Sequence, residues 1–297
     1  MVFDIVQLLR LLGGEGALIA ARGSPLGIGS DIGGSIRIPA HFCGIFGFKP
    51  TPGRLTYKGV IPASSRDEIG ESHIASTIGP LARCTDDLVL VVRALLQERA
   101  WLDDPQLARQ PWREERFTDK KRLTIGYYTN DNWFTPAPAC IRAVNEAAEV
   151  LRQLGHTVVP YTPIDVPEAV RLFNSMVGAD NNRHFLEVLE GEAINPMYGG
   201  LVQSSMLPNF LRPLAAYLLR LTGEKRGAFI LQSVGSKTAY EYFDLVIDWR
   251  KYIQRWLDDL RNNHIDLLLV SKYRRRPAEL KPSSSIDASQ CFTRLSS

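Results

Sequence analysis

Apolar residues recur at strand and helix spacings along most of the chain, and their order predicts an α/β fold. An apolar run at Leu123–Tyr128 predicts a strand, periodic apolar positions predict a helix over Pro138–Leu154, and Thr157–Pro160 predicts a second strand. Gly155 is placed to end the helix, because glycine readily adopts the left-handed conformation found after many helices. The order strand, helix, strand predicts a βαβ unit. The helix positions expected to face inward are Ile141, Val144, Ala148, Leu151 and Leu154.

Three further segments have helical periodicity. A helix is predicted over residues 85–97, with the threonine at its start as the capping residue, and another over residues 165–189, whose aspartate and proline are typical of a helix start. A third is predicted over residues 236–262, capped by its serine, and its apolar stripe favours core packing over ligand binding. The apolar run Ile265–Val270 predicts a buried strand.

The segment Met206–Leu221 combines apolar residues at helical spacing with basic residues at its edges. It is too short and too interrupted to span a bilayer. The pattern fits an amphipathic helix lying on a membrane surface, and it fits a buried amphipathic helix equally well. The apolar positions are Leu207, Phe210, Leu211, Leu214, Leu218 and Leu221, and the basic ones are Arg212, Arg220, Lys225 and Arg226.

Composition and charge narrow the class of protein. With 297 residues, of which 45% are hydrophobic, the chain can bury a large core, which argues against a disordered protein. The formal net charge of +3 comes from residues 271–297, where six basic residues accompany two acidic ones. The remainder is close to neutral, so no basic footprint for nucleic acid covers the fold. Residues 271–297 lack a periodic pattern and are predicted to form a disordered tail.

The cysteines and histidines show none of the spacings that hold metals or disulfide frameworks. The four cysteines are scattered without a C-x-x-C pair, and the five histidines are isolated from one another. We therefore expect reduced thiols, no metal and an intracellular protein, because no signal peptide or transmembrane span is recognisable either.

Residues 23–50 contain the best candidate nucleophile, Ser35. Gly33 and Gly34 leave the backbone before it without side chains, so a substrate carbonyl can approach and consecutive N–H groups can point at one oxygen. Donors fixed in this way form an oxyanion hole, in which removing one donor costs about 3 to 4 kcal/mol. On residue chemistry alone, a Gly-rich surface turn with an incidental serine explains the same residues.

Other readings of the glycines fit less well. Gly27, Gly29 and Gly33 have the spacing G-x-G-x-x-x-G, which differs from the dinucleotide-binding G-x-G-x-x-G, and Asp31 would place a carboxylate where a pyrophosphate must lie. The run lacks the Gly-Lys-Ser/Thr ending of a P-loop and a G-x-S-x-G elbow. Pro39 argues against a helix directly after the serine. A nucleotide site is therefore disfavoured.

Five short runs around the serine together resemble the amidase signature family. They are Gly13–Ile19 (GGEGALI), Ser24–Gly27 (SPLG), Asp31–Pro39 (DIGGSIRIP), Phe42–Ile45 (FCGI) and Lys49–Thr51 (KPT). Within the family, Ile32 and the runs Pro111–Glu115 (PWREE) and Gly126–Asn132 (GYYTNDN) resemble the fatty acid amide hydrolase branch most. Fungal-type short-chain amidases come second.

The resemblance implies a Ser-Ser-Lys triad that works without a metal or cofactor. In the family a neutral lysine is the base, a serine in a cis-peptide loop relays the proton, and the serine matching Ser35 attacks the amide carbonyl to give an acyl-enzyme. Ser30, Asp31 and Arg37 are expected to support the loop, the last two through charge-assisted hydrogen bonds. The backbone N–H groups that match the family's oxyanion hole belong to Ile32, Gly33, Gly34 and Ser35.

The resemblance also implies an architecture and partners. The expected fold is a mixed sheet flanked by helices, with residues 1–270 forming a partial amidase domain and 271–297 a divergent tail. In the fatty acid amide hydrolases of the family, the region similar to Met206–Leu221 is a hydrophobic cap that lies in one membrane leaflet. The expected partners are therefore a small-molecule lipid amide, a membrane surface on the cytosolic face of endomembranes, and a second copy in a homodimer.

The chain departs from the family pattern at the residues that transfer the proton. Counting back from Ser35 places Leu11 at the position of the relay serine, and leucine cannot carry a proton. No residue matches the family's lysine, since Lys49 belongs to the Lys-Pro-Thr run after the nucleophile. Triad members act as a unit, so two hypotheses stay open: a fatty acid amide hydrolase acting through Ser35, with a short-chain amidase as its variant, or an inactive, truncated amidase fragment.

Overall fold

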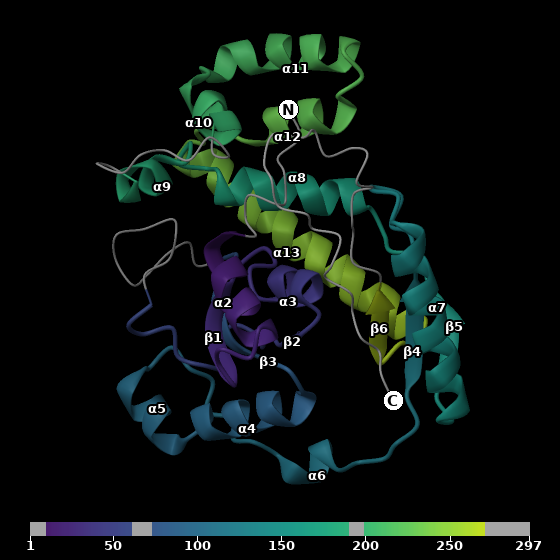
Figure 1. Cartoon of the computed structure of the whole chain (residues 1–297). Coiled ribbons are helices and arrows are strands. Elements are labelled where there is room, and N and C mark those ends of the chain that lie inside the picture. Colours follow the sequence, from purple (N-terminus) through teal and green to yellow (C-terminus); the bar gives the residue numbers. More distant parts are fainter. Residues whose placement is uncertain (1–9, 61–72, 190–198, 271–297) are drawn as a thin grey trace. The chain divides into compact units, whose positions relative to one another are not determined.

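The computed structural model describes residues 10–60, 73–189 and 199–270 (Figure 1). These residues form two compact units. Unit 1 takes its described residues from the chain up to Arg113 and from Phe173–Tyr242, and unit 2 takes them from Glu114–Leu172 and from Phe243 to Val270. The tail predicted over residues 271–297 lies outside the described residues.

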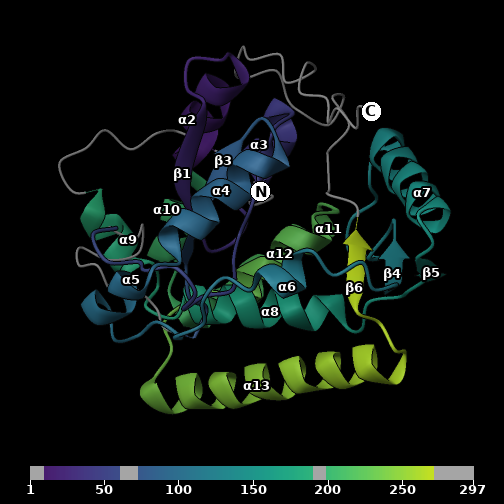
Figure 2. The ribbon, with the colours of Figure 1, turned by 90° about the horizontal axis from the view of Figure 1, so that it is seen from below.

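Unit 2 contains the predicted βαβ unit. Strand β4 (Thr124–Tyr128), helix α7 (Pro138–Gln153) and strand β5 (Thr157–Pro160) follow in order, and β6 (Leu267–Val270) completes a parallel sheet with strand order β5-β4-β6. The three strands lie side by side with α7 beside them (Figure 2). Ile125, Ala148 and Val158 form one buried cluster between the sheet and α7, and α7 also buries Cys140 and Val144. The α/β prediction is confirmed.

Helix α7 departs from the prediction at one position. Gly155, with a φ of 90°, follows the helix end as expected. Leu154 was expected to face inward, but 69% of its surface is exposed. It is the C-terminal capping residue, so its side chain lies at the position where α7 ends.

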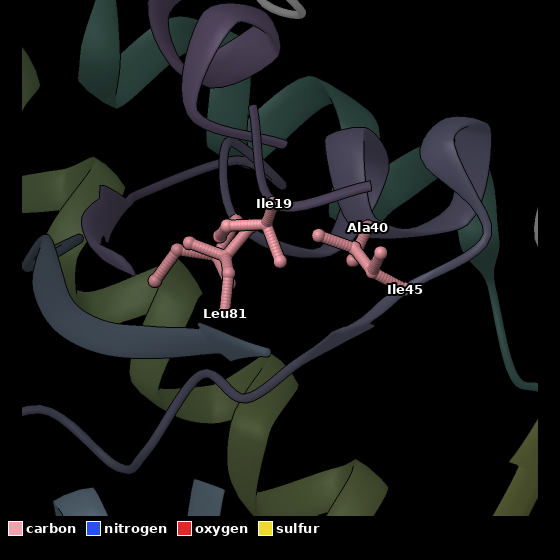
Figure 3. Packing of buried hydrophobic residues seen from close by; sticks show 5 residues of the cluster. Ile19, Ala40, Ile45 and Leu81 are labelled. Carbon is pink, nitrogen blue, oxygen red and sulfur yellow. The ribbon is translucent and has the colours of Figure 1, made fainter. Parts of the chain in front are cut away.

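Unit 1 is built on an antiparallel sheet with strand order β1-β3-β2. The strands are β1 (Leu26–Asp31), β2 (Phe46–Gly47) and β3 (Thr77–Ala82), and Asp31 pairs with Thr77 at the end of β1. The surrounding helices include α2 (Arg10–Ala20), α3 (Arg37–Cys43), α4 (Thr85–Leu95) and α5 (Glu98–Asp103). Ile19, Ala40, Ile45 and Leu81 pack together between α2, α3 and β3 (Figure 3), and the fully buried Ile36 belongs to the same cluster.

Three predicted helices start or break at other residues than expected. Cys84, not Thr85, is the capping position of α4. Residues 165–189 form two helices, α8 (Val166–Val177) and α9 (Arg183–Val188), because Asn181 and Asn182 adopt the left-handed conformation with φ of 61° and 59°.

The long helix α13 (Ala239–Asn262) begins with a capping box instead of the predicted serine. The Thr238 N–H donates to the Glu241 carboxylate at 2.7 Å, and the Glu241 N–H donates to the Thr238 hydroxyl at 3.2 Å. Helix α6 (Glu114–Phe117) contains the first residues of unit 2.

The segment Met206–Leu221 spans the end of α10 (Gly199–Met206), the short helix η2 (Asn209–Leu211) and α11 (Arg212–Leu221), and α12 (Lys225–Ser233) follows. Helices α11 and α12 form a hairpin (Figure 1) that buries Ala216, Ala228 and Leu231. Leu207, Ala215 and Leu219 pack against this cluster, whereas six other apolar side chains of the segment are exposed, and we call these six the exposed apolar face. Its members are Met206, Phe210, Leu214, Tyr217, Leu218 and Leu221, each more than half exposed.

A buried arginine fixes the start of α11. Arg212 donates to the Asn181 side-chain oxygen and to the Ser204 carbonyl, both at 2.8 Å, and to the Asn209 side-chain oxygen at 3.2 Å. Burial lowers the pKa of Arg212. These hydrogen bonds connect α11 to the corner between α8 and α9, so the exposed apolar face has a fixed orientation within unit 1. Residues 10–60, 73–189 and 199–270 contain no helix with the length and hydrophobicity of a membrane span.

Candidate active site

Ser35 lies in the turn that connects β1 to α3. Its residue surface is only 5% exposed, whereas Gly33, two positions earlier, is exposed. The next residue, Ile36, is anchored in the core, which holds the turn in place. Helix α3 begins at Arg37 with Pro39 in its first turn, where a missing N–H costs no helical hydrogen bond. The expectation that Pro39 excludes a helix just after Ser35 is therefore wrong.

Asp31, at the end of β1, holds the turn together. One carboxylate oxygen accepts the Gly34 N–H at 2.7 Å and the Arg37 Nη2 at 2.9 Å, and the other accepts the Arg37 Nε at 2.9 Å and the Ile36 N–H at 3.2 Å. Burial would raise the pKa of Asp31, but the hydrogen bond and charge of Arg37, with the N–H groups of Gly34 and Ile36, hold it below its usual value. Asp31 and Arg37 make the charge-assisted hydrogen bonds predicted for them.

The hydrogen bonds of Asp31 remove one N–H group from the predicted set of oxyanion donors. The Gly34 N–H is engaged by Asp31. In the described part of the chain, the N–H groups of Ile32, Gly33 and Ser35 have no protein acceptor. The candidate donors are therefore the N–H groups of Ile32, Gly33 and Ser35, without that of Gly34.

The backbone conformation and the packing at position 34 both require a glycine. Its φ is 129°, a conformation that residues with a side chain rarely adopt, and a methyl group on it would lie 2.5 Å from the Ile38 Cδ1. We expect Gly34→Ala to lower the free energy of unfolding by about 2 to 4 kcal/mol, through backbone strain and overpacking together. The measurement is urea unfolding at pH 7.

The matched control for this prediction is Gly59→Ala. Gly59 also has a positive φ, 83°, but a methyl group there would meet no atom within 4 Å among the described residues. Gly59→Ala should therefore lower the free energy of unfolding by only about 1 kcal/mol. Equal losses for the two variants would contradict the packing argument.

The remaining predicted positions lie in neighbouring elements of unit 1. Ser30 lies in β1 opposite Ile78, and Leu11 lies in the first turn of α2. Lys49 is half-buried, and burial lowers its pKa, although the charge of Asp31 raises it and that of Arg37 lowers it further. Lys49 thus lies within electrostatic reach of the site, but no hydrogen bond joins it to Ser35.

Phe173 of α8 is near the site and was not predicted from the sequence. A methyl group on Gly33 would lie 3.3 Å from the Phe173 Cζ. In the sequence it is one apolar residue of an amphipathic helix, and nothing in that pattern distinguishes it from a core residue.

Comparison with known proteins identifies the family of the chain. The sequence pattern of the family described as Amidase matches residues 13–289, so the chain belongs to the amidase family. It is 36% identical to fatty-acid amide hydrolase 1 of Sus scrofa over 87% of this chain and 44% of that protein. It is 38% identical to an acetamidase of Aspergillus oryzae over 57% of this chain and 32% of that protein.

A solved structure of a fatty acid amide hydrolase has the same fold. It aligns with a TM-score of 0.65 at 24% identity, over 88% of this chain and 42% of that one. The chain thus spans less than half the length of the curated relatives named above.

Proposed function

We propose that the chain carries the nucleophile and oxyanion hole of a serine amidase that cleaves apolar acyl amides. The observation that carries this proposal is the buried Ser35 on a glycine turn, which Asp31 and Arg37 brace within a chain of the amidase family. Preorganised N–H groups beside a nucleophile supply the electrostatic part of amide cleavage.

The proposed reaction has two steps. The Ser35 oxygen bonds to the amide carbonyl carbon as its proton leaves to a base, and the carbonyl electrons move onto the oxygen held by the N–H groups of Ile32, Gly33 and Ser35. Collapse breaks the C–N bond, and the amine departs with a proton. Water then hydrolyses the acyl-enzyme ester, which releases the acid and restores the hydroxyl.

A fluorophosphonate probe and oleamide test this proposal on the purified chain. We expect covalent labelling and ammonia release that depend on Ser35 and disappear in Ser35→Ala, while Ser30→Ala, a matched serine substitution, retains both. Turnover should be slow, because no residue matches the family's lysine base and Leu11 occupies the position of the relay serine, so Ser35 attacks without the family's proton path. Folded wild-type protein without labelling would contradict the proposal.

That negative result would support the second candidate, an inactive amidase fragment. The observation that favours it is Leu11, which lies in helix α2 at the position of the family's relay serine. A leucine there removes a proton path, and Lys49 makes no hydrogen bond to Ser35 that would replace it.

For the substrate we propose fatty acid amides presented at a membrane surface on the cytosolic face of endomembranes. The similarity to fatty-acid amide hydrolase 1 and the exposed apolar face of η2 and α11 support this choice. Short acyl amides are the alternative, supported by the similarity to the acetamidase. The rates on oleamide and acetamide distinguish the two.

A further inference from the structure

The phenyl ring of Phe173 lies over the open side of the glycine turn. A methyl group on Gly33 would stand 3.3 Å from the Phe173 Cζ and 4.0 Å from its Cε1. Among the described residues, and apart from the two chain neighbours of Gly33, no other atom lies within 4 Å of that point. Phe173 is therefore the one described side chain that bounds the space in front of Gly33.

Helix α8 fixes the backbone from which the Phe173 ring extends. Two residues further along α8, the buried Ser175 donates its hydroxyl hydrogen to the Ser233 carbonyl at 2.8 Å. Met176 is also almost fully buried. These contacts fix the C-terminal half of α8 within unit 1, which holds the backbone of Phe173 beside the turn.

The space next to Gly33 is where part of a substrate would lie. An amide oxygen bound by the N–H groups of Ile32, Gly33 and Ser35 brings the carbon attached to the carbonyl close to the exposed Gly33. An unbranched acyl group has two hydrogens at that carbon, whereas a branched one adds methyl groups toward the Phe173 ring. A gap of about one methyl group separates ring and turn, so branching produces overlap.

We propose that Phe173 determines acyl specificity, by admitting apolar acyl groups that are unbranched at the carbon next to the carbonyl and excluding branched ones. The inference rests on the proposed function of Ser35. One methylene or methyl group in such a pocket changes kcat/KM by roughly 10 to 200-fold.

The test compares the p-nitroanilides of hexanoic acid and of 2,2-dimethylhexanoic acid. Phe173→Ala should raise kcat/KM for the branched substrate relative to the linear one by about 10-fold or more. Phe173→Tyr should shift the ratio the opposite way, because the added hydroxyl extends from Cζ, the atom nearest Gly33. Phe243→Ala, which truncates an exposed ring on α13, should leave the ratio unchanged. An unchanged ratio in Phe173→Ala would overturn the inference.

A second readout separates this inference from the proposed function. Calorimetry gives the Kd of hexanamide and of 2,2-dimethylhexanamide for Ser35→Ala and for Ser35→Ala/Phe173→Ala, without any turnover. If wild type hydrolyses neither anilide but Phe173→Ala shifts the Kd ratio, the inference stands and the proposed function fails. If wild type hydrolyses the anilides and neither ratio moves, the inference fails alone. If neither amide binds, both fail. Phe173→Leu replaces the alanine variant if circular dichroism shows that the latter is unfolded.

Discussion

Asp31→Ala is expected to lower the free energy of unfolding by about 3 to 5 kcal/mol. The substitution removes the acceptor of the buried Gly34 and Ile36 N–H groups and leaves the Arg37 charge without its counter-ion. Because the Arg37 side chain is about half exposed and can be solvated, the orphaned N–H groups make the larger part of the loss. Urea unfolding at pH 7 measures the effect.

The pH dependence gives an independent signature of the same carboxylate. The pKa of Asp31 is lower in the folded chain than its ordinary value near 4, so its contribution to stability is present above about pH 4 and is lost as the pH falls through the lower folded pKa. The stability difference between wild type and Asp31→Ala should therefore shrink below about pH 4.

Two controls make this prediction specific. Asp86→Ala removes an exposed carboxylate in the first turn of α4 and should cost less than about 1 kcal/mol. Asp31→Asn keeps the shape without the charge and provides a folded variant if alanine does not. A constant difference between wild type and the Asp31 variants from pH 7 to pH 3 would contradict the argument.

Removing the exposed apolar face should abolish most binding to lipid vesicles. Phe210, Leu214 and Leu218 are 79%, 57% and 54% exposed, so each can enter a bilayer without unpacking the hairpin. Burying such a side chain stabilises by about 1.5 to 3 kcal/mol, and partial insertion of three is worth at least about 3 kcal/mol. The triple serine variant should therefore bind phosphatidylcholine vesicles at least about 100-fold more weakly in sedimentation assays.

The control substitutes three exposed leucines that lie elsewhere. Leu90, Leu102 and Leu154 are each more than 60% exposed but belong to α4, α5 and the end of α7. Their triple serine variant should bind vesicles like wild type. Wild-type chain that fails to sediment with vesicles, or a triple variant of the apolar face that sediments equally, would contradict a membrane role for α11.

The sequence predicted unit 2 better than unit 1, for a physical reason. Helix α7 has a periodic apolar pattern, and β4, β5 and β6 are apolar runs, so local sequence indicates each element. The prediction that β6 is buried is wrong, because Leu267 and Val270 at its ends are 50% and 45% exposed. Strand β1 reads LGIGSD and β3 carries Pro80 in the centre of its sheet, so both have weak local strand preference. They are strands because they pair with each other, and pairing across some fifty residues leaves no local signal.

Some features of the candidate site could be predicted from a local motif, and others depend on tertiary structure. Ser35, Asp31 and Arg37 lie within seven residues, so a short motif could identify them, and the structure brings Asp31 and Arg37 together as predicted. The loss of the Gly34 N–H to Asp31 depends on the direction of one backbone group. The position of Phe173 beside Gly33 depends on tertiary packing between residues 140 positions apart in the chain. Neither is encoded in a local pattern.

The register of β4 affects how the chain is made. Ile125 pairs with Val158 on one side and with Leu267 on the other, and the residues of unit 1 between Phe173 and Tyr242 are synthesised before that second partner. At ribosomal rates of about 5 to 20 residues per second, β6 follows β4 by roughly 7 to 28 s. During that interval the nascent chain carries an apolar strand with an unpaired edge. Translation speed and chaperone access to this edge should therefore govern the yield of native protein in cells.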